Sequence, residues 1–143
     1  MLSHAITTLE RDFRGRLIQR ADPRYDDARR LYNGMIDKRP LLIAQCADVA
    51  DVVSAVSFGR ERELRVAIRG GGHNGPGLGS VDDGLVIDLS AMRGVRVDPA
   101  TRTVRVEAGC RTGDVDHATH AFGLAVPFGI VSTTGVSGLT LGG

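Results

Sequence analysis

Short apolar runs and an amphipathic stretch alternate in the middle of the chain. A short, mainly apolar run covers residues 41–46 after Pro40, and a second covers 64–68. Short runs bounded by residues that break helices are typical of buried strands. Between them, valines recur at three- and four-residue spacing over 49–56, the period of one helical face, after the favourable N-cap residue Asp48. This order predicts a βαβ unit with parallel strands.

The pattern on either side of this unit is more varied. Apolar residues at i, i+4 and i+8 predict a short amphipathic helix over 9–19, and a second helix is predicted over 26–35. After the unit, the apolar run at 85–89 predicts a third strand. Valines then alternate with arginines on both sides of a proline-containing turn, which predicts an antiparallel hairpin with one polar face over 95–106.

The C-terminal part is rich in small residues. A helix is predicted over 112–121, stopped by Gly123, and is followed by an irregular strand over 124–134. Residues 135–143 (GVSGLTLGG) are uncharged and glycine-rich, a composition typical of the middle of a buried segment that contacts a ligand. We therefore expect the chain to be the N-terminal piece of a longer protein.

Together these elements predict an α+β protein in three parts. Residues 1–36 form an N-terminal helical segment. Residues 37–92 form a small βαβ subdomain that contains a glycine-rich loop. Residues 93–143 form the start of an antiparallel-strand subdomain, which is incomplete.

Composition narrows the possible functions of the 143-residue chain. Its net charge of +1 and aromatic content of 4% give neither the basic field nor the stacking platform of a nucleic-acid-binding protein, so no nucleic-acid partner is expected. No apolar run approaches the roughly 20 residues that cross a bilayer, so no membrane partner is expected. Because the N-terminus lacks a signal-peptide pattern, we expect a cytoplasmic protein. The cysteines Cys46 and Cys110 are expected to be buried thiols.

The strand predicted at 64–68 leads into the sequence RGGGHNG at 69–75. Consecutive glycines leave backbone N–H groups open to a bulky anion, of which a pyrophosphate is the usual example. His73 would then stand beside the organic group that the pyrophosphate carries, which suits a covalently tethered flavin dinucleotide. Three of the glycines also spell the Rossmann fingerprint, but that motif needs a helix to begin inside it. The proline and glycines of 76–84 disfavour a helix, so strand–loop–strand is predicted instead.

Five segments of the chain together resemble a known family. They are 33–40 (NGMIDKRP), 69–74 (RGGGHN), 84–90 (GLVIDLS), 123–127 (GLAVP) and 132–136 (STTGV). In combination they are specific. They resemble the flavin domain of FAD-linked oxidoreductases in the vanillyl-alcohol oxidase and p-cresol methylhydroxylase superfamily. The branch that the chain resembles is that of the berberine-bridge-enzyme-like and hydroxynicotine-oxidase-like proteins.

The resemblance implies an FAD-binding domain of the p-cresol methylhydroxylase type, with FAD as the cofactor. It also implies that His73 is bonded to the 8α-methyl group of the isoalloxazine. A second bond, which some members form from a cysteine, would fall at Val131, so a single histidyl link is expected and Cys110 is not expected to bind flavin. The residues that the resemblance assigns to cofactor binding are Arg69, Gly70, Gly71, Gly72, His73, Asn74, Gly77, Leu78, Gly129, Val131, Thr133, Gly135 and Gly138.

The family implies a flavin-dependent oxidoreductase that oxidises a small organic substrate by hydride transfer to flavin N5. Its substrate-selecting groups and catalytic base belong to a separate substrate domain, so no catalytic residue is assigned in this chain. The alternative is a truncated fragment without catalytic activity, at most a non-covalent nucleotide-binding module. For His73, the corresponding alternative is a loop histidine satisfied by backbone hydrogen bonds.

Two further patterns are weak. His117 and His120 lie three residues apart on a predicted helix, but a third well-placed metal ligand is missing, so a solvated helix face is expected and no metal site. The sequence at 135–139 departs from the G-x-S-x-G hydrolase elbow because Leu139 replaces the last glycine, which disfavours a catalytic triad.

Overall fold

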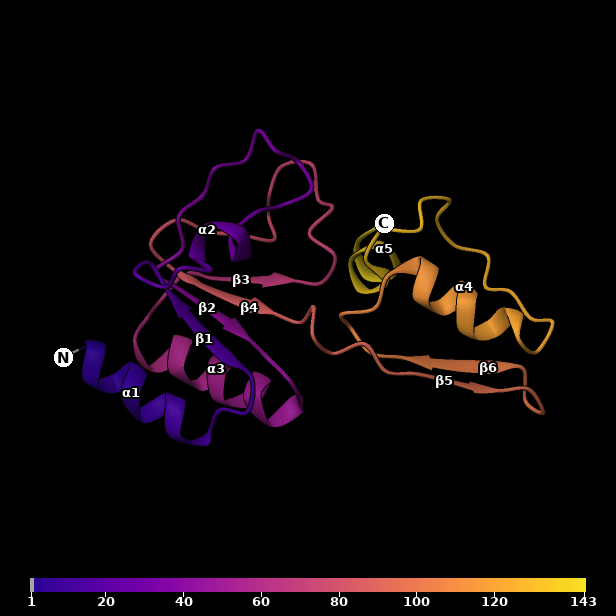
Figure 1. Cartoon of the computed structure of the whole chain (residues 1–143), viewed down its shortest axis with the longest axis horizontal. Coiled ribbons are helices and arrows are strands. Elements are labelled where there is room, and N and C mark those ends of the chain that lie inside the picture. Colours follow the sequence, from indigo (N-terminus) through magenta and orange to yellow (C-terminus); the bar gives the residue numbers. More distant parts are fainter. Residues whose placement is uncertain (1) are drawn as a thin grey trace.

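A four-stranded sheet and a two-stranded hairpin form the frame of the molecule (Figure 1). The computed structural model describes residues 2–143. The elements in chain order are α1 (Leu2–Asp12), β1 (Arg16–Gln19), α2 (Tyr25–Ala28), β2 (Leu42–Gln45), α3 (Val49–Glu61), β3 (Val66–Arg69), β4 (Leu85–Asp88), β5 (Val95–Asp98), β6 (Thr103–Val106), α4 (Thr112–His120) and α5 (Val136–Gly142). The larger sheet has the strand order β1, β2, β4, β3.

The predicted parallel strands are confirmed, and β4 lies between them. Leu42 of β2 and Val66 of β3 both pair with Leu85 of β4, while β1 runs antiparallel to β2. β4 is therefore a central strand, and all four of its residues are buried. The prediction that the second strand is buried holds for one face only, because β3 lies at the sheet edge with Val66 and Ile68 exposed and Ala67 and Arg69 buried.

Each face of the sheet carries its own apolar cluster. α1 and α3 cover one face, and α2 lies on the other (Figure 1). Because successive residues of a strand point to opposite faces, β2 and β4 contribute to both clusters. The cluster beneath α1 and α3 includes Leu42, Ala44, Leu85 and Ile87 with Ala55 and Phe58, and the cluster beneath α2 includes Ile18, Tyr25, Ile43, Ala67 and Val86.

α3 lies where the sequence predicts it, but its valine face is not the buried one. Val49, Val53 and Val56 are between 48% and 68% exposed. The helix packs on the sheet through Ala55, Phe58 and Gly59, and of its valines Val52 packs against the same cluster. A Cβ on Gly59 would lie 2.9 Å from Cγ2 of Val66, so the helix approaches the sheet more closely than a valine face would allow.

A buried carboxylate fixes this rotation of α3. Asp51 is 1% exposed and accepts hydrogen bonds from the N–H groups of Arg14, Gly15 and Ala47, each at 2.8 Å. These bonds join the first turn of α3 to the turn before β1 and to the residues after β2. Because residues two positions apart lie on nearly opposite sides of a helix, the valines on either side of Asp51 face outward.

The predicted helix over 9–19 is wrong in its second half. α1 ends at Asp12, and residues 16–19 form β1. The chain changes direction at Gly15, where a Cβ would lie 1.9 Å from the carbonyl oxygen of Gln45. Only glycine permits such a close approach of two backbones, so the helix gives way to a strand.

The predicted helix over 26–35 is reduced to the single turn of α2. The residues after α2 extend toward the glycine-rich loop instead of continuing the helix. The Tyr32 N–H donates to the Gly72 carbonyl at 3.1 Å, and the Asn33 side chain donates to the Gly75 carbonyl at 2.9 Å. Long-range contacts with the loop therefore replace local helical hydrogen bonds.

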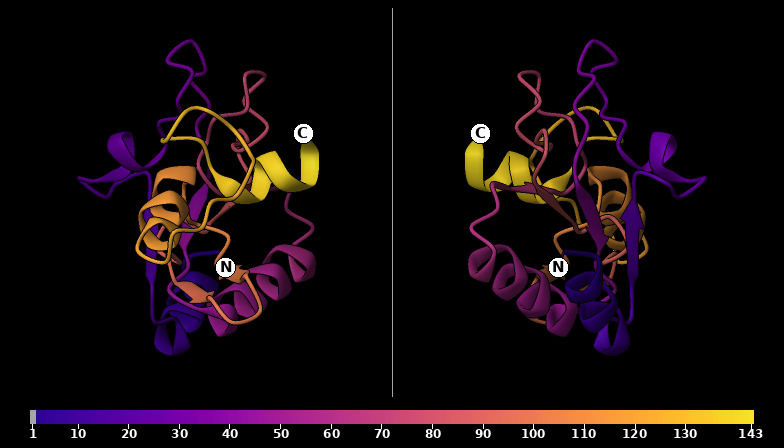
Figure 2. Two further views of the ribbon diagram at one scale, coloured as in Figure 1. Left: turned by 90° about the vertical axis from the view of Figure 1, so that its right-hand side faces the viewer. Right: turned by 90° about the vertical axis from the view of Figure 1, so that its left-hand side faces the viewer.

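The predicted hairpin is confirmed, because β5 and β6 pair antiparallel with Val95 opposite Val106. The predicted helix over 112–121 is also confirmed as α4, and Gly123 follows it with a φ of +65°, a conformation that favours glycine. Figure 2 shows α1 and α3 together on one side of the molecule, with α4 and α5 at a different level above them.

The segment at 124–134 is irregular and contributes no named strand to the described chain. Gly135, which follows it, forms an isolated antiparallel bridge with Arg111. The glycine-rich tail then forms α5, a helix that the sequence did not predict. None of the helices within residues 2–143 has both the length and the hydropathy needed to span a bilayer.

Replacing Asp51 tests the role of the buried carboxylate. Asp51→Ala removes the buried acceptor of three part-buried hydrogen bonds from backbone N–H groups, so we expect the free energy of unfolding to fall by about 2–4 kcal/mol. Urea denaturation measures this change. The exposed Asp116 of α4 supplies the control, since Asp116→Ala should change the stability by less than about 0.5 kcal/mol. Equal effects of the two substitutions would contradict the assignment.

Thiol reactivity tests the burial of both cysteines. Cys46 and Cys110 are free and buried, as the sequence predicts. Burial raises the pKa of the Cys46 thiol to about 12 and also raises the pKa of the Cys110 thiol. Both thiols therefore stay protonated at pH 8, and we expect neither to react with a disulfide reagent until the protein is unfolded. A native thiol that reacts as fast as free cysteine would contradict this.

Candidate functional site

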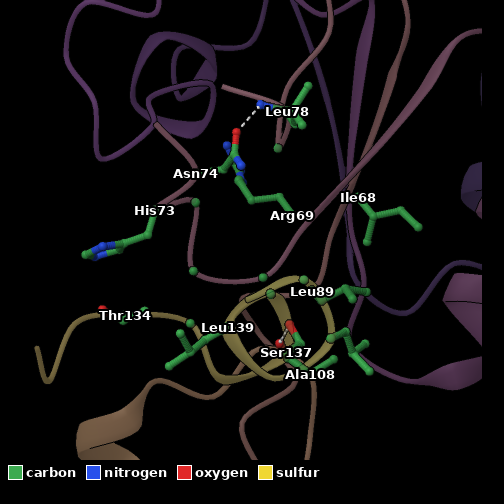
Figure 3. A pocket seen from close by; sticks show the side chains of 18 of the residues that line it. Ile68, Arg69, His73, Asn74, Leu78, Leu89, Ala108, Thr134, Ser137 and Leu139 are labelled. Atoms are coloured by element: carbon green, nitrogen blue, oxygen red, sulfur yellow. Dashed lines mark hydrogen bonds between the residues drawn. The ribbon is translucent and has the colours of Figure 1, made fainter. Parts of the chain in front are cut away.

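A cavity of about 780 Å³ lies between the glycine-rich loop after β3 and the residues around α5 (Figure 3). The two walls come from segments more than 50 residues apart in the sequence, and Ala108 also lines the cavity. Nine of the residues that the sequence assigns to cofactor binding line this cavity. They are Arg69, Gly70, Gly71, Gly72, His73, Asn74, Leu78, Gly135 and Gly138.

The two walls of the cavity meet at a direct backbone contact between Gly71 and Gly135, which we call the seam. A Cβ on Gly71 would lie 2.4 Å from the backbone nitrogen of Gly135, and a Cβ on Gly135 would lie 2.4 Å from the backbone nitrogen of Gly71. A Cβ on Gly70 would lie 2.5 Å from Oγ of Ser137. Real Cβ atoms do not approach other atoms this closely, so the seam requires glycine on both sides.

The loop turns without forming a helix, as predicted. Gly72 and Gly77 have φ values of +69° and +76°, in the left-handed region that favours glycine. The side-chain oxygen of Asn74 accepts a hydrogen bond from the Leu78 N–H at 2.9 Å, and its carbonyl accepts one from the Gly77 N–H at 3.0 Å. Asn74 thus closes the turn locally. The Rossmann interpretation is excluded because no helix begins inside the motif.

Because the loop forms no helix, the backbone N–H groups at its start are left without hydrogen-bond acceptors in the described part of the chain. Among the hydrogen bonds of residues 2–143, none is donated by a backbone N–H between Gly70 and Gly75. The Gly72 and Gly75 carbonyls, in contrast, accept the hydrogen bonds from Tyr32 and Asn33 described above. The loop therefore turns its acceptors toward the protein and keeps a run of donors, an arrangement that suits an anion.

A lysine supports the second half of the loop. Nζ of Lys38, the sole lysine of the chain, donates to the Gly77 carbonyl at 2.7 Å and to the Ser80 carbonyl at 3.0 Å. Lys38 belongs to the segment at 33–40 that carried part of the family resemblance. That segment therefore shapes the loop from outside the cavity.

His73 is held between two distant parts of the chain. Its ring stacks on the ring of Tyr32 with a centroid separation of 3.8 Å and an angle of 16° between the planes. Its Nε2 atom lies 3.1 Å from Oγ1 of Thr133, so the hydroxyl either donates to this nitrogen or accepts from it according to the tautomer. In Figure 3 the imidazole projects from the loop toward the side where Thr134 lies.

Four of the predicted residues lie outside the cavity wall. Gly77 shapes the loop, and Thr133 contacts His73. Gly129 and Val131 belong to the irregular segment, where the Val131 carbonyl accepts a hydrogen bond from the Thr112 hydroxyl at 2.8 Å. The structure thus places Gly129 and Val131 near α4 and α5 and not at the seam.

Several residues of the site have no clear sequence signal. Apolar residues at strand ends, Ile68 and Leu89, look like core positions but line the cavity. Ser137 drew attention only as part of an incomplete hydrolase elbow, and its hydroxyl donates to the Ala108 carbonyl at 2.9 Å. Tyr32 looked like part of a helical stripe. The rule that ligands bind beyond the carboxyl ends of parallel strands could have identified Ile68 and Leu89.

The described residues contain no cluster of three or more His, Cys, Asp or Glu side chains that could hold a metal ion. His117 and His120 are exposed on α4, as expected for a solvated helix face. Cys110 does not line the cavity. The polar side chains that line the cavity are those of Arg69, His73, Asn74, Thr134 and Ser137.

Comparison with known proteins identifies the family. The family model described as "FAD binding domain" matches residues 40–143, which include both walls of the cavity. The chain belongs to the FAD binding domain family. The resemblance described from the sequence is thereby confirmed, together with the cofactor-binding character of the fold.

Individual relatives agree with this assignment. An FAD-linked oxidoreductase of Dictyostelium discoideum is 49% identical over 105 residues, covering 73% of this chain and 23% of the relative. The crystal structure of 6-hydroxy-D-nicotine oxidase from Arthrobacter nicotinovorans matches with a TM-score of 0.84 and 31% identity, covering 87% of this chain and 27% of that chain. BBE-like 1 of Physcomitrella patens matches with a TM-score of 0.87 and 27% identity, covering all of this chain and 31% of that chain.

This FAD binding domain thus spans less than a third of the length of these relatives. Its residues fit the diphosphate of FAD. Glycines stand where a Cβ would intrude on the seam, and unused N–H groups run along one wall. Bare backbone and free donors are what a close-packed diphosphate requires.

A methyl group at the seam tests its geometry. Gly71→Ala forces a Cβ against the Gly135 backbone, so we expect the two walls to separate and the free energy of unfolding to fall by about 1–3 kcal/mol. Thermal or urea denaturation measures the loss. Gly34→Ala is the matched control, because a Cβ there meets no atom within 4 Å and should leave stability nearly unchanged. A fully stable Gly71→Ala protein would contradict the close contact.

Proposed function

We propose that the chain binds FAD as the N-terminal part of a flavin-dependent oxidoreductase. The observation that carries this proposal is the run of unused N–H donors from Gly70 to Gly75, beside the glycine seam. In the proposed arrangement these donors bind the diphosphate, and the apolar wall formed by Leu89, Leu139 and Leu141 packs against uncharged parts of the cofactor. Of the other predicted cofactor-binding residues, Gly77 shapes the loop and Thr133 contacts His73, whereas Gly129 and Val131 lie near α4 and α5.

We further propose that His73 is the point of covalent attachment, at the 8α-methyl group of the flavin. Stacking on Tyr32 fixes the plane of the imidazole, and the contact with Thr133 fixes its rotation within that plane. A fixed nucleophile close to a bound partner reacts more readily than a mobile one. The alternative of a loop histidine satisfied by backbone groups has less support, since the polar contact of the ring is a side-chain hydroxyl.

When bound, FAD supplies two-electron redox chemistry by accepting hydride from a small organic substrate. The proposed role of this chain is to hold the cofactor, orient it and anchor it. The name of the related 6-hydroxy-D-nicotine oxidase describes action on a small molecule of this kind. We assign neither the groups that select the substrate nor the catalytic base to residues 1–143.

Acid precipitation after incubation with FAD tests covalent attachment. We expect flavin absorbance in the pellet of the wild-type chain and none in the pellet of His73→Ala, which should still bind FAD reversibly. His117→Ala is the control, because His117 is exposed on α4, and it should behave as the wild type does. Reversible FAD binding by the wild type with a colourless pellet would favour a non-covalent nucleotide-binding module.

A further inference from the structure

The side chain of Arg69 occupies the inside of the glycine-rich loop. Arg69 is the last residue of β3 and pairs in register with Asp88, the last residue of β4. Its Nη2 atom lies 2.8 Å from Oδ2 of Asp88, and the two side chains are only 8% and 2% exposed. The ion pair therefore joins the carboxyl ends of two neighbouring strands directly beneath the cavity.

The loop wraps around the aliphatic part of this side chain. A Cβ on Gly72 would lie 3.5 Å from Cδ of Arg69, and a Cβ on Gly79 would lie 3.6 Å from its Cγ. These glycines belong to opposite limbs of the loop, so the methylene groups of Arg69 keep the limbs apart. Figure 3 shows the Arg69 side chain running from the strand end toward Asn74. Its Nη1 atom also reaches the Arg30 carbonyl at 3.4 Å.

The charge of Arg69 is already balanced. Asp88 holds the guanidinium through Oδ2, and its Oδ1 atom accepts a hydrogen bond from the Ser90 N–H at 3.1 Å. Nε2 of Gln45 approaches the same carboxylate at 3.4 Å. To bind the Arg69 guanidinium, an anion in the cavity would have to displace the Asp88 carboxylate. This carboxylate accepts several hydrogen bonds and is almost completely buried. Buried pairs of this kind resist separation because each charge would be left uncompensated.

We propose that Arg69 and Asp88 are positioning residues for the glycine-rich loop. The diphosphate is then bound by the backbone N–H groups of this loop and not by the Arg69 guanidinium. The buried pair sets the shape of the loop at 70–79, and this shape directs the N–H groups into the cavity. The inference rests on the proposed FAD binding. It assigns to the Arg69 side chain a role different from a direct charge contact with the cofactor.

A double-mutant cycle tests the inference. FAD dissociation constants are measured by calorimetry for the wild type, Arg69→Met, Asp88→Leu and the double variant, with melting temperatures recorded in parallel. Arg69→Met leaves the Asp88 carboxylate buried and unpaired near the diphosphate, so we expect FAD binding to weaken at least about 10-fold. The double variant keeps the interior of the loop filled with apolar side chains of similar size and leaves no charge unpaired, so we expect affinity within about threefold of the wild type.

The control and the opposing results separate the possibilities. Arg105 is exposed on β6, so Arg105→Met should bind FAD as the wild type does. A double variant that folds but binds as weakly as Arg69→Met would overturn the inference, because the guanidinium itself would then be needed. A wild-type chain that does not bind FAD would instead overturn the proposed function.

A measurement on the wild type avoids any dependence on how the variants fold. The Nε–H resonance of Arg69 can be followed by nuclear magnetic resonance during an FAD titration, with assignment by comparison with Arg69→Lys. We expect the resonance to change little, because the guanidinium keeps its carboxylate partner. A large shift at saturation, as expected when the guanidinium exchanges Asp88 for a phosphate, would overturn the inference.

Discussion

The site depends on the direct backbone contact between Gly71 and Gly135. No side chain fits between these residues, so the loop after β3 and the segment before α5 can meet only where both carry glycine. Both glycines line the cavity, and their contact joins the loop after β3 to the part of the molecule that contains β5, β6, α4 and α5. The loop forms no helix, and within residues 2–143 its N–H groups from Gly70 to Gly75 donate no hydrogen bond.

Elements with strong local signals could be predicted from the sequence, and those defined by distant contacts could not. The buried run of β4 and the alternating valines of β5 and β6 are local patterns, and the structure confirms them. The end of α1 depends instead on the contact of Gly15 with Gln45, which no local pattern contains. The rotation of α3 depends on the inward position of Asp51 and its hydrogen bonds to Arg14, Gly15 and Ala47, which no local pattern contains.

The site shows the same division. The glycine run and His73 could be identified because their composition is unusual and matches a family motif. Tyr32 and Ser137 join the site only through tertiary contacts, so their sequence neighbourhood gave no sign of them. Arg69 was assigned to the cofactor by motif, whereas its pairing with Asp88 became visible only when the two strand ends were placed side by side. Family motifs thus identify the site residues, whereas the contacts that each residue makes become visible only in the folded structure.

The central claim is that backbone N–H groups of one loop receive the diphosphate of FAD. Nitrogen-15 amide spectra recorded during titration with FAD, and with riboflavin as a ligand without the diphosphate, test it most directly. The account predicts that FAD shifts the amide signals of Gly70 to Gly75 and of Gly135, and that riboflavin leaves the Gly70–Gly72 signals nearly unchanged. Shifts confined to the residues of α1 and α3, or equal shifts at the loop with both ligands, would contradict it.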